Sequence, residues 1–318
     1  MSNGPAAAPD RVGVVLMAYG TPRHPSEIES YYTDIRRGRP PTPEALADLT
    51  ARYEAIGGVS PLARLTEGQR DALQRALDDT DPGRFEVAIG LKHADPKVEV
   101  TAQALADRGF GSIVGLVLAP HYSAFSIGQY LDRVREGVDP TGRDIDVHGI
   151  ESWATEPAFV EFLAADLAAR LSAMHLRTPG RVRVLFTAHS LPERIVATGD
   201  PYPDELRSTA VAVADRLGLV EGDDWQLAWQ SAGRTPEPWI GPDILTVIDD
   251  LGTQDVAGVI VCACGFVADH LEVLYDLDIE AARRASTNGL AFDRTACVND
   301  DSAIMAALAD RVRHAAGV

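Results

Sequence analysis

The sequence contains an apolar, β-branched run, Val182-Arg183-Val184-Leu185-Phe186-Thr187-Ala188, that leads directly into His189-Ser190-Leu191-Pro192. A short apolar run bounded by turn residues is typical of a strand in a parallel sheet. The histidine would then lie at the C-terminal end of that strand, which is the edge where open α/β sheets bind ligands.

The same pattern repeats along the chain, because short apolar runs alternate with longer amphipathic stretches, as in βα units. We expect one set of strands near Val12–Met17, Phe85–Leu91, Ile113–Ala119 and Ile145–Ile150. A second set is expected near Val182–Ala188, Gln226–Gln230, Val259–Cys262 and Leu290–Arg294. Helical periodicity is clearest in Pro43–Ala55, Glu67–Asp78, Pro157–Ala173, Asp204–Leu217, His270–Arg284 and Ser302–His314.

This order predicts an α/β fold with two similar Rossmann-like domains, each a four-stranded parallel sheet flanked by helices. The first domain would span residues 1–150 and the second 151–300, and the last helix, 301–318, would pack back on the first. Most of the expected strands run into polar, titratable or glycine-rich residues. We therefore expect one active-site cleft between the two domains.

Charge excludes some partners. The 318 residues include 47 acidic and 29 basic side chains, a formal net charge of −18. Nucleic acids and anionic membranes bind to basic faces, so neither is expected as a partner. No apolar run approaches the roughly 18 residues that span a bilayer, and residues 1–11 lack the segments of a secretory signal. We expect a cytoplasmic protein without an integral membrane segment.

Several chemistries lack their motifs. The chain has no G-x-x-x-x-G-K-[ST] phosphate loop, no G-x-S-x-G nucleophile elbow and no H-E-x-x-H. Its only cysteines are Cys262, Cys264 and Cys297, one short of a four-cysteine metal or iron–sulfur site. Nucleotide-driven and serine-nucleophile reactions are therefore disfavoured.

Two patterns could bind a divalent cation. If 270–280 is helical, the carboxylates of Glu272, Asp276 and Glu280 recur at i, i+4 and i+8 on one face, where a cation would offset their repulsion. A solvated face of an acidic protein has the same pattern, and composition does not decide between the two. His189 is either a buried, hydrogen-bonded residue or, with a carboxylate from another strand end, part of an iron(II) or zinc site.

Arginines form a cationic spot in Ile35-Arg36-Arg37-Gly38-Arg39, with Arg52-Tyr53 downstream. The planar guanidinium fork suits carboxylates and phosphates. Because Lys92 and Lys97 are the only lysines, a general bias toward arginine is the alternative explanation.

Taken together, these stretches resemble the ferrochelatase family, which inserts iron(II) into a porphyrin. The resemblance covers nearly the whole chain. Its most specific blocks are Ala188-His189-Ser190-Leu191-Pro192 and residues 265–276, Gly-Phe-Val-Ala-Asp-His-Leu-Glu-Val-Leu-Tyr-Asp. Further matching stretches are residues 16–22, 31–39, 52–62, 90–93, 118–123 and 229–236. One departure is Ala263-Cys264, where the family pattern has proline followed by valine or isoleucine.

Within the family, the chain is similar to the bacterial branch that uses coproporphyrin III rather than protoporphyrin IX. Tyr19 in the first loop, the short length and the lack of a cysteine-bearing C-terminal tail are typical of that branch. The resemblance implies a lyase-class chelatase that inserts Fe(II) into coproporphyrin III to give coproheme in haem biosynthesis. It implies no organic cofactor and no iron–sulfur cluster, with iron as a substrate and transient contact with downstream haem-pathway enzymes.

The resemblance also implies roles for individual residues. His189 and Glu272 would be the catalytic and metal-binding pair, with Asp276 and Glu280 as an outer metal site. Tyr19 would be the axial contact to the metal of the bound iron porphyrin. The macrocycle or its propionates would be contacted by Arg36, Arg52, Tyr53, Ser60 and Tyr130.

Alternative functions remain at this point. The chain could use protoporphyrin IX, act as a sirohydrochlorin or cobalt chelatase, or carry haem without turnover. Metal selectivity, iron donor, product acceptor, oligomeric state and the role of Cys262 and Cys264 do not follow from the sequence.

Overall fold

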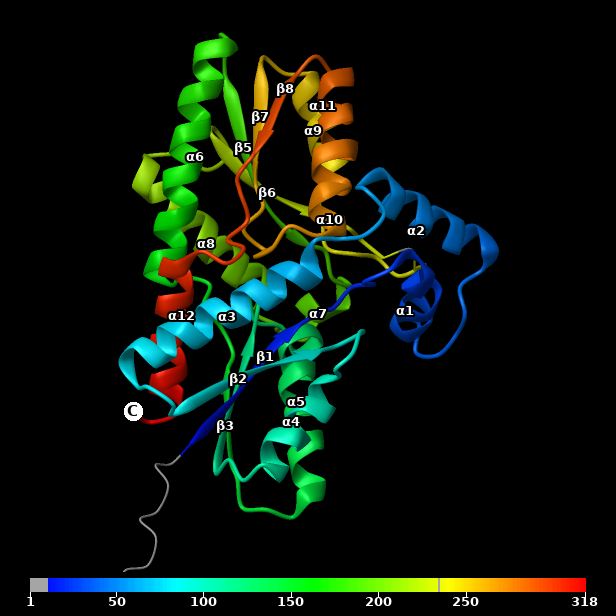
Figure 1. Cartoon of the computed structure of the whole chain (residues 1–318). Helices are drawn as coiled ribbons and strands as arrows, with labels where there is room; N and C mark the ends of the chain where they lie inside the picture. The colour runs from blue at the N-terminus through cyan, green and yellow to red at the C-terminus, as the bar shows by residue number, and fades with distance from the viewer. Residues whose placement is uncertain (1–10, 234) are drawn as a thin grey trace, which may run out of the picture.

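Two four-stranded parallel sheets organise the protein, whose computed structural model describes residues 11–233 and 235–318 (Figure 1). Their strand orders are β2-β1-β3-β4 and β6-β5-β7-β8. The strands are β1 (Val12–Ala18), β2 (Phe85–Leu91), β3 (Ser112–Val117), β4 (Asp146–Ile150), β5 (Val182–His189), β6 (Trp225–Gln230), β7 (Gly258–Cys262) and β8 (Ala291–Arg294). Each coincides with a predicted strand, and the predicted fold class is confirmed.

Both sheets have the same strand order within their own half of the chain. In the first sheet, β2 lies on one side of β1, and β3 and β4 lie on the other, so the strand order reverses between β1 and β3. In the second sheet, it reverses in the same way between β5 and β7. Ligands of such sheets bind outside the C-terminal strand ends at the reversal point. The chain therefore has two equivalent sites for functional residues, one after β1 and one at the end of β5.

Helices cover both sheets. The longer ones are α3 (Leu62–Thr80), α4 (Val98–Asp107), α5 (Gln129–Val138), α6 (Pro157–Arg177), α8 (Tyr202–Leu217), α9 (Ile244–Gly252) and α12 (Ser302–Ala315). Two more, α1 (Ile28–Ile35) and α2 (Pro43–Ala55), project to one side at the level where the halves meet (Figure 1). The short elements are η1 (Pro25–Glu27), η2 (Ala124–Gly128), η3 (Asp139–Thr141) and α7 (Arg194–Ala197). Among the described residues, no helix is both long and apolar enough to cross a membrane.

The last helix, α12, packs against α3 and β4 of the first half. Its Leu308 belongs to a buried apolar cluster that also contains Leu73 of α3 and Phe186 of β5. Arg313 of α12 pairs with Asp81 at 2.7 Å. A continuous apolar core thus joins the two halves, while the domain boundaries expected from the sequence stay a prediction.

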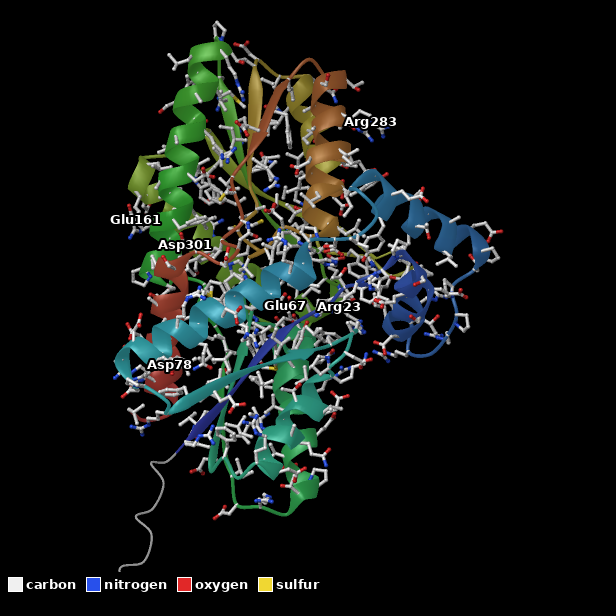
Figure 2. The ribbon with its side chains drawn as sticks, viewed as in Figure 1. Arg23, Glu67, Asp78, Glu161, Arg283 and Asp301 are labelled. Carbon is white, nitrogen blue, oxygen red and sulfur yellow. The ribbon has the colours of Figure 1, made fainter. Side chains whose placement is uncertain are left out.

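The loop after β1 is held from two sides. Gly20 has a φ of +89°, and a Cβ there would lie 2.9 Å from the Cβ of Ala94 in the loop after β2. Only glycine therefore allows the two loops to approach this closely. On the other side, Arg23 Nη2 lies 2.8 Å from Glu67 Oε1 of α3, and Figure 2 labels both residues.

The predicted helix over 270–284 is not one regular α-helix. The segment consists of α10 (Leu271–Leu274), a π-helical turn η4 (Asp276–Ala281) and α11 (Ala282–Thr287). Glu280 N donates to Tyr275 O at 2.9 Å, an i→i+5 bond. The prediction of an uninterrupted α-helix, with carboxylates at a strict i, i+4 spacing, is therefore wrong. Such π-helical turns inside helices occur frequently at functional sites.

Candidate active site

Parallel pairing brings the candidate residues to common sheet edges. His189 ends β5 and pairs with Gln230, the last residue of β6. In the first half, Ala18 pairs with Leu91 at the ends of β1 and β2. Tyr19 and His93 follow these strand ends, and His93 N donates to Tyr19 O at 2.9 Å.

A glycine brings Glu272 to His189. The chain leaves β7 and crosses the end of β5 at Gly265, whose N donates to Thr187 O at 2.9 Å. A Cβ on Gly265 would lie 2.4 Å from the Cβ of Ala188, so a larger residue would push this crossing away from β5. The close crossing places the start of α10, with Glu272, beside the end of β5.

His189 and Glu272 form the centre of the candidate site. His189 Nε2 lies 3.5 Å from Glu272 Oε1, and His270 Nε2 lies 3.6 Å from Glu272 Oε2. His189 Nδ1 bonds to the carbonyl oxygen of Ser190, which directs Nε2 toward Glu272. The side chains of His189 and Glu272 are 33% and 36% exposed, so both remain accessible.

Each member of this pair stabilises the charge of the other. Burial disfavours the His189 imidazolium, but the Glu272 carboxylate more than offsets this effect and raises the pKa of His189 to about 9. Burial also disfavours the Glu272 carboxylate, and the His189 cation outweighs this and lowers the pKa of Glu272 well below its usual range. Near neutral pH the two side chains therefore form an imidazolium–carboxylate pair, and a metal that binds Nε2 must displace a proton.

A titration should detect this coupling. Glu272→Gln is expected to lower the pKa of His189 from about 9 toward or below the usual value of an imidazole, because burial then acts without the compensating carboxylate. The His189 ring would be followed by NMR from pH 5 to 10 and assigned with a His189→Ala sample. An unchanged His189 pKa in Glu272→Gln would contradict the coupling.

The donor set suits a borderline metal. An imidazole nitrogen and a carboxylate oxygen are typical ligands of iron(II) or zinc. Among residues 11–233 and 235–318, no group of three or more His, Cys, Asp or Glu side chains is arranged to hold a metal ion. A metal at His189 and Glu272 would therefore keep open positions for water or an incoming substrate.

The outer carboxylates are engaged differently. Asp276 is buried, and its Oδ2 accepts from Ser231 Oγ at 2.5 Å, while its Oδ1 lies 3.3 Å from Arg52 Nη1 of α2. Burial and then the nearby Glu272 charge raise the pKa of Asp276 to about 6. Glu280 is only partly buried. An expected propionate contact, Arg52, is thus paired with an expected outer metal ligand.

Three of the predicted macrocycle contacts are buried. Tyr53 Oη lies 3.3 Å from Thr21 Oγ1, and burial raises the pKa of Tyr53 to about 12. Ser60 Oγ accepts from Leu62 N at 3.2 Å, and Tyr130 lies with its ring 5.1 Å from Lys92 Nζ. A bound porphyrin could therefore contact Tyr53, Ser60 and Tyr130 only through the few side-chain atoms that stay accessible.

The other predicted contacts are more open. Tyr19 is 43% exposed, and burial of its ring together with the Glu272 charge raises its pKa. The Glu272 carboxylate of the second half is thus near enough to influence the pKa of Tyr19 in the first half. Arg36 directly follows α1, and its Nε donates to Arg39 O at 3.2 Å. In the described part of the chain, no carboxylate lies within ion-pair distance of Arg36, Arg37 or Arg39.

A comparison with family models matches the ferrochelatase model to residues 11–316. The chain belongs to the ferrochelatase family. As a member, it is a metal chelatase of the lyase class.

Curated relatives agree with this assignment. The chain is 42% identical to the ferrochelatase of Herpetosiphon aurantiacus, over 93% of this chain and 96% of that one. It is 42% identical to the coproporphyrin III ferrochelatase of Geobacillus kaustophilus, over 94% of both chains. It is 44% identical to the coproporphyrin III ferrochelatase of Halalkalibacterium halodurans, over 85% of this chain.

Solved structures of chelatases share the fold. The structure described as SirB from Bacillus subtilis with Fe3+ superposes with a TM-score of 0.56 at 11% identity, covering 96% of each chain. CbiX, described as the terminal enzyme of sirohaem biosynthesis in denitrifying bacteria, gives 0.52 at 12% identity. At such identities the likeness concerns the two-sheet architecture alone.

Sequence reasoning missed several residues of this ferrochelatase site. His270 provides a second imidazole to Glu272, Ser231 anchors Asp276, and His93 lies against Tyr19 with a ring-centroid distance of 4.6 Å. For His93, the sequence did contain a signal. The only two lysines of the chain, Lys92 and Lys97, lie close to it in the loop after β2, although every other cationic position is an arginine.

Proposed function

We propose that this ferrochelatase inserts Fe(II) into coproporphyrin III and yields coproheme for haem biosynthesis. The observation that carries the proposal is the His189–Glu272 pair, whose Nε2 and Oε1 atoms lie 3.5 Å apart at the C-terminal end of β5 and whose side chains are both partly exposed. Relatives that are 42–44% identical and named coproporphyrin III ferrochelatase support the choice of porphyrin.

The chemistry requires an exchange of protons for a metal. Insertion releases two pyrrole N–H protons while iron(II) gives up its water ligands for the porphyrin nitrogens. Iron(II) would first replace the proton on His189 Nε2, with Glu272 as the second ligand. As iron moves to the macrocycle, the freed imidazole nitrogen can take one pyrrole proton, so His189 would act in turn as metal ligand and base. The proton that iron displaces from Nε2 and the second pyrrole proton would pass to water.

A turnover assay tests the proposal. The protein would be mixed anaerobically with excess iron(II) and coproporphyrin III, and the loss of the free-base visible bands would be followed. We expect product in large excess over protein. Product that stops at one equivalent per protein would instead indicate a haem-binding protein, and turnover with cobalt and sirohydrochlorin alone would indicate the other chelatase class.

The outer acidic residues should act on iron uptake. Asp276→Asn together with Glu280→Gln is expected to raise the KM for iron about tenfold with a smaller effect on kcat, because these carboxylates lie beyond Glu272 and would not reach the pyrrole nitrogens. Anaerobic steady-state kinetics with varied iron would measure both constants. Asp310→Asn with Glu161→Gln, two exposed carboxylates on other helices, is the control. A kcat that collapses as in Glu272→Gln would contradict the division into inner and outer sites.

Other expectations stay predictions. We propose that the enzyme needs no organic cofactor and carries no iron–sulfur cluster, since its three cysteines are one short of a four-cysteine cluster site. Transient contact with downstream haem-pathway enzymes and a cytoplasmic location likewise stay predictions.

A further inference from the structure

A carboxylate on α1 joins two segments at the C-terminal end of β2. Asp34 Oδ2 lies 2.7 Å from His93 Nδ1, and Asp34 Oδ1 accepts from Lys97 Nζ at 2.8 Å. A carboxylate that is already paired with an ammonium group only accepts hydrogen bonds, so His93 donates from Nδ1. Both oxygens of Asp34 are thereby used, and the plane of the His93 ring is held.

His93 in turn contacts Tyr19. The two ring centroids are 4.6 Å apart at an interplanar angle of 53°, and His93 N donates to Tyr19 O at 2.9 Å. The side chain of His93 is only 11% exposed, whereas Tyr19 is 43% exposed. An aromatic side chain as exposed as Tyr19 would exchange rotamers freely without such a neighbour. The buried imidazole restricts this motion from one side.

We propose that Asp34, Lys97 and His93 form a positioning chain that orients the Tyr19 ring toward the metal of the bound porphyrin. The inference rests on the proposed function and on the role that the family resemblance implies for Tyr19, which is contact with that metal. None of the three residues needs to touch the substrate. They act through Tyr19 as hydrogen-bonded outer partners act on a metal ligand.

The choice of lysine supports this assignment. All basic residues of the chain other than Lys92 and Lys97 are arginines, so a lysine here runs against the bias of the sequence. A lysine ammonium is a compact point charge that can occupy one carboxylate oxygen, whereas the arginine fork pairs with both oxygens of a carboxylate. With Lys97 on Oδ1, Oδ2 of Asp34 stays available to His93.

A double-mutant cycle tests the chain. The probe is iron(III) coproporphyrin III, and the readout is the absorption and resonance Raman signature of phenol coordination to its iron. His93→Ala should weaken this signature and lower turnover by about 10- to 100-fold. His93→Phe, which keeps an aromatic ring against Tyr19 but loses the bond to Asp34, should show the same direction of change and guards against a fold defect in His93→Ala.

The cycle is closed by Tyr19→Phe, which removes the phenol oxygen. If His93 acts through Tyr19, adding His93→Ala to Tyr19→Phe should change turnover by no more than about twofold. The same loss in both backgrounds would indicate a purely structural role and would overturn the proposal. Asp34→Asn should lower turnover in the same direction as His93→Ala. Its matched control is Asp249→Asn, since Asp249 also bonds two partners, Arg284 at 2.7 Å and Asn288 at 2.8 Å, and is about as exposed as Asp34.

The position of Tyr19 and the turnover of coproporphyrin III are measured separately. A wild-type complex without a phenol signature would overturn the positioning chain even if turnover is normal. A wild-type protein with the phenol signature and no turnover of coproporphyrin III would overturn the proposed function and leave the positioning of Tyr19 intact.

Discussion

His189→Ala is expected to lower kcat by about two orders of magnitude or more, the usual loss when a positioned acid–base group is removed. Nε2 of His189 is the atom that would bind iron and then accept a pyrrole proton, and it lies 3.5 Å from Glu272 Oε1. Glu272→Gln should lose activity to a similar extent, because an amide neither binds iron comparably nor offsets the imidazolium charge.

Both variants should remain folded. The side chains of His189 and Glu272 are each about one third exposed, at 33% and 36%, and contribute little to the apolar core. Circular dichroism and thermal melts would verify this, with His175→Ala on the exposed face of α6 as the histidine control. Activity retained in a folded His189→Ala protein would exclude the exchange of iron for a proton at Nε2.

The second large effect concerns substrate choice. Coproporphyrin III carries four propionates where protoporphyrin IX carries two, so it brings about two more negative charges near neutral pH. A chain of net charge −18 repels such a ligand unless its site is locally cationic. Arg36, Arg37 and Arg39 supply cations that no described carboxylate neutralises within ion-pair distance.

We expect kcat/KM to favour coproporphyrin III over protoporphyrin IX, and Arg36→Ala to reduce that preference by roughly 10- to 100-fold. The range corresponds to the loss of one charge-assisted contact of about 1.5–3 kcal/mol. Added salt should reduce the preference for coproporphyrin III, because salt screens charge interactions over about 8 Å at physiological ionic strength.

Parallel assays with both porphyrins, at low and high salt, would measure this preference. Arg283→Ala removes an exposed arginine of α11, in the second half of the chain, and should leave it unchanged (Figure 2). Equal use of both porphyrins with no response to Arg36→Ala would overturn the choice of coproporphyrin III while the ferrochelatase assignment stands.

The strands could be predicted because the apolar runs that form them consist of residues adjacent in the sequence. A strand buried in a parallel sheet needs a continuous apolar run, and β1 and β5 are buried along almost their whole lengths. Predicted and observed limits agree fully for Phe85–Leu91 and differ by one or two residues elsewhere. The limits of the helix α2 also agree, since Thr42 caps its first turn by accepting from Ala45 N at 3.3 Å.

The segment from Leu271 to Thr287 shows where local reasoning fails. Its sequence has helical periodicity, yet its middle turn is π-helical, with Glu280 N bonded to Tyr275 O. Its bonding depends on what surrounds it: Asp276 is buried and anchored by Ser231 from the end of β6 and by Arg52 from α2. None of these partners is near in sequence.

The sequence by itself determined the two-sheet fold and the family, because buried strands and the motifs at their ends are encoded by adjacent residues. Only the tertiary structure decided which of these residues meet. Arg52 lies against Asp276 from the other half of the chain, and Asp34 of α1 holds both His93 and Lys97 beside Tyr19. Such contacts join residues far apart in sequence, and they form because parallel strands end at one edge and the projecting α1 and α2 return to it.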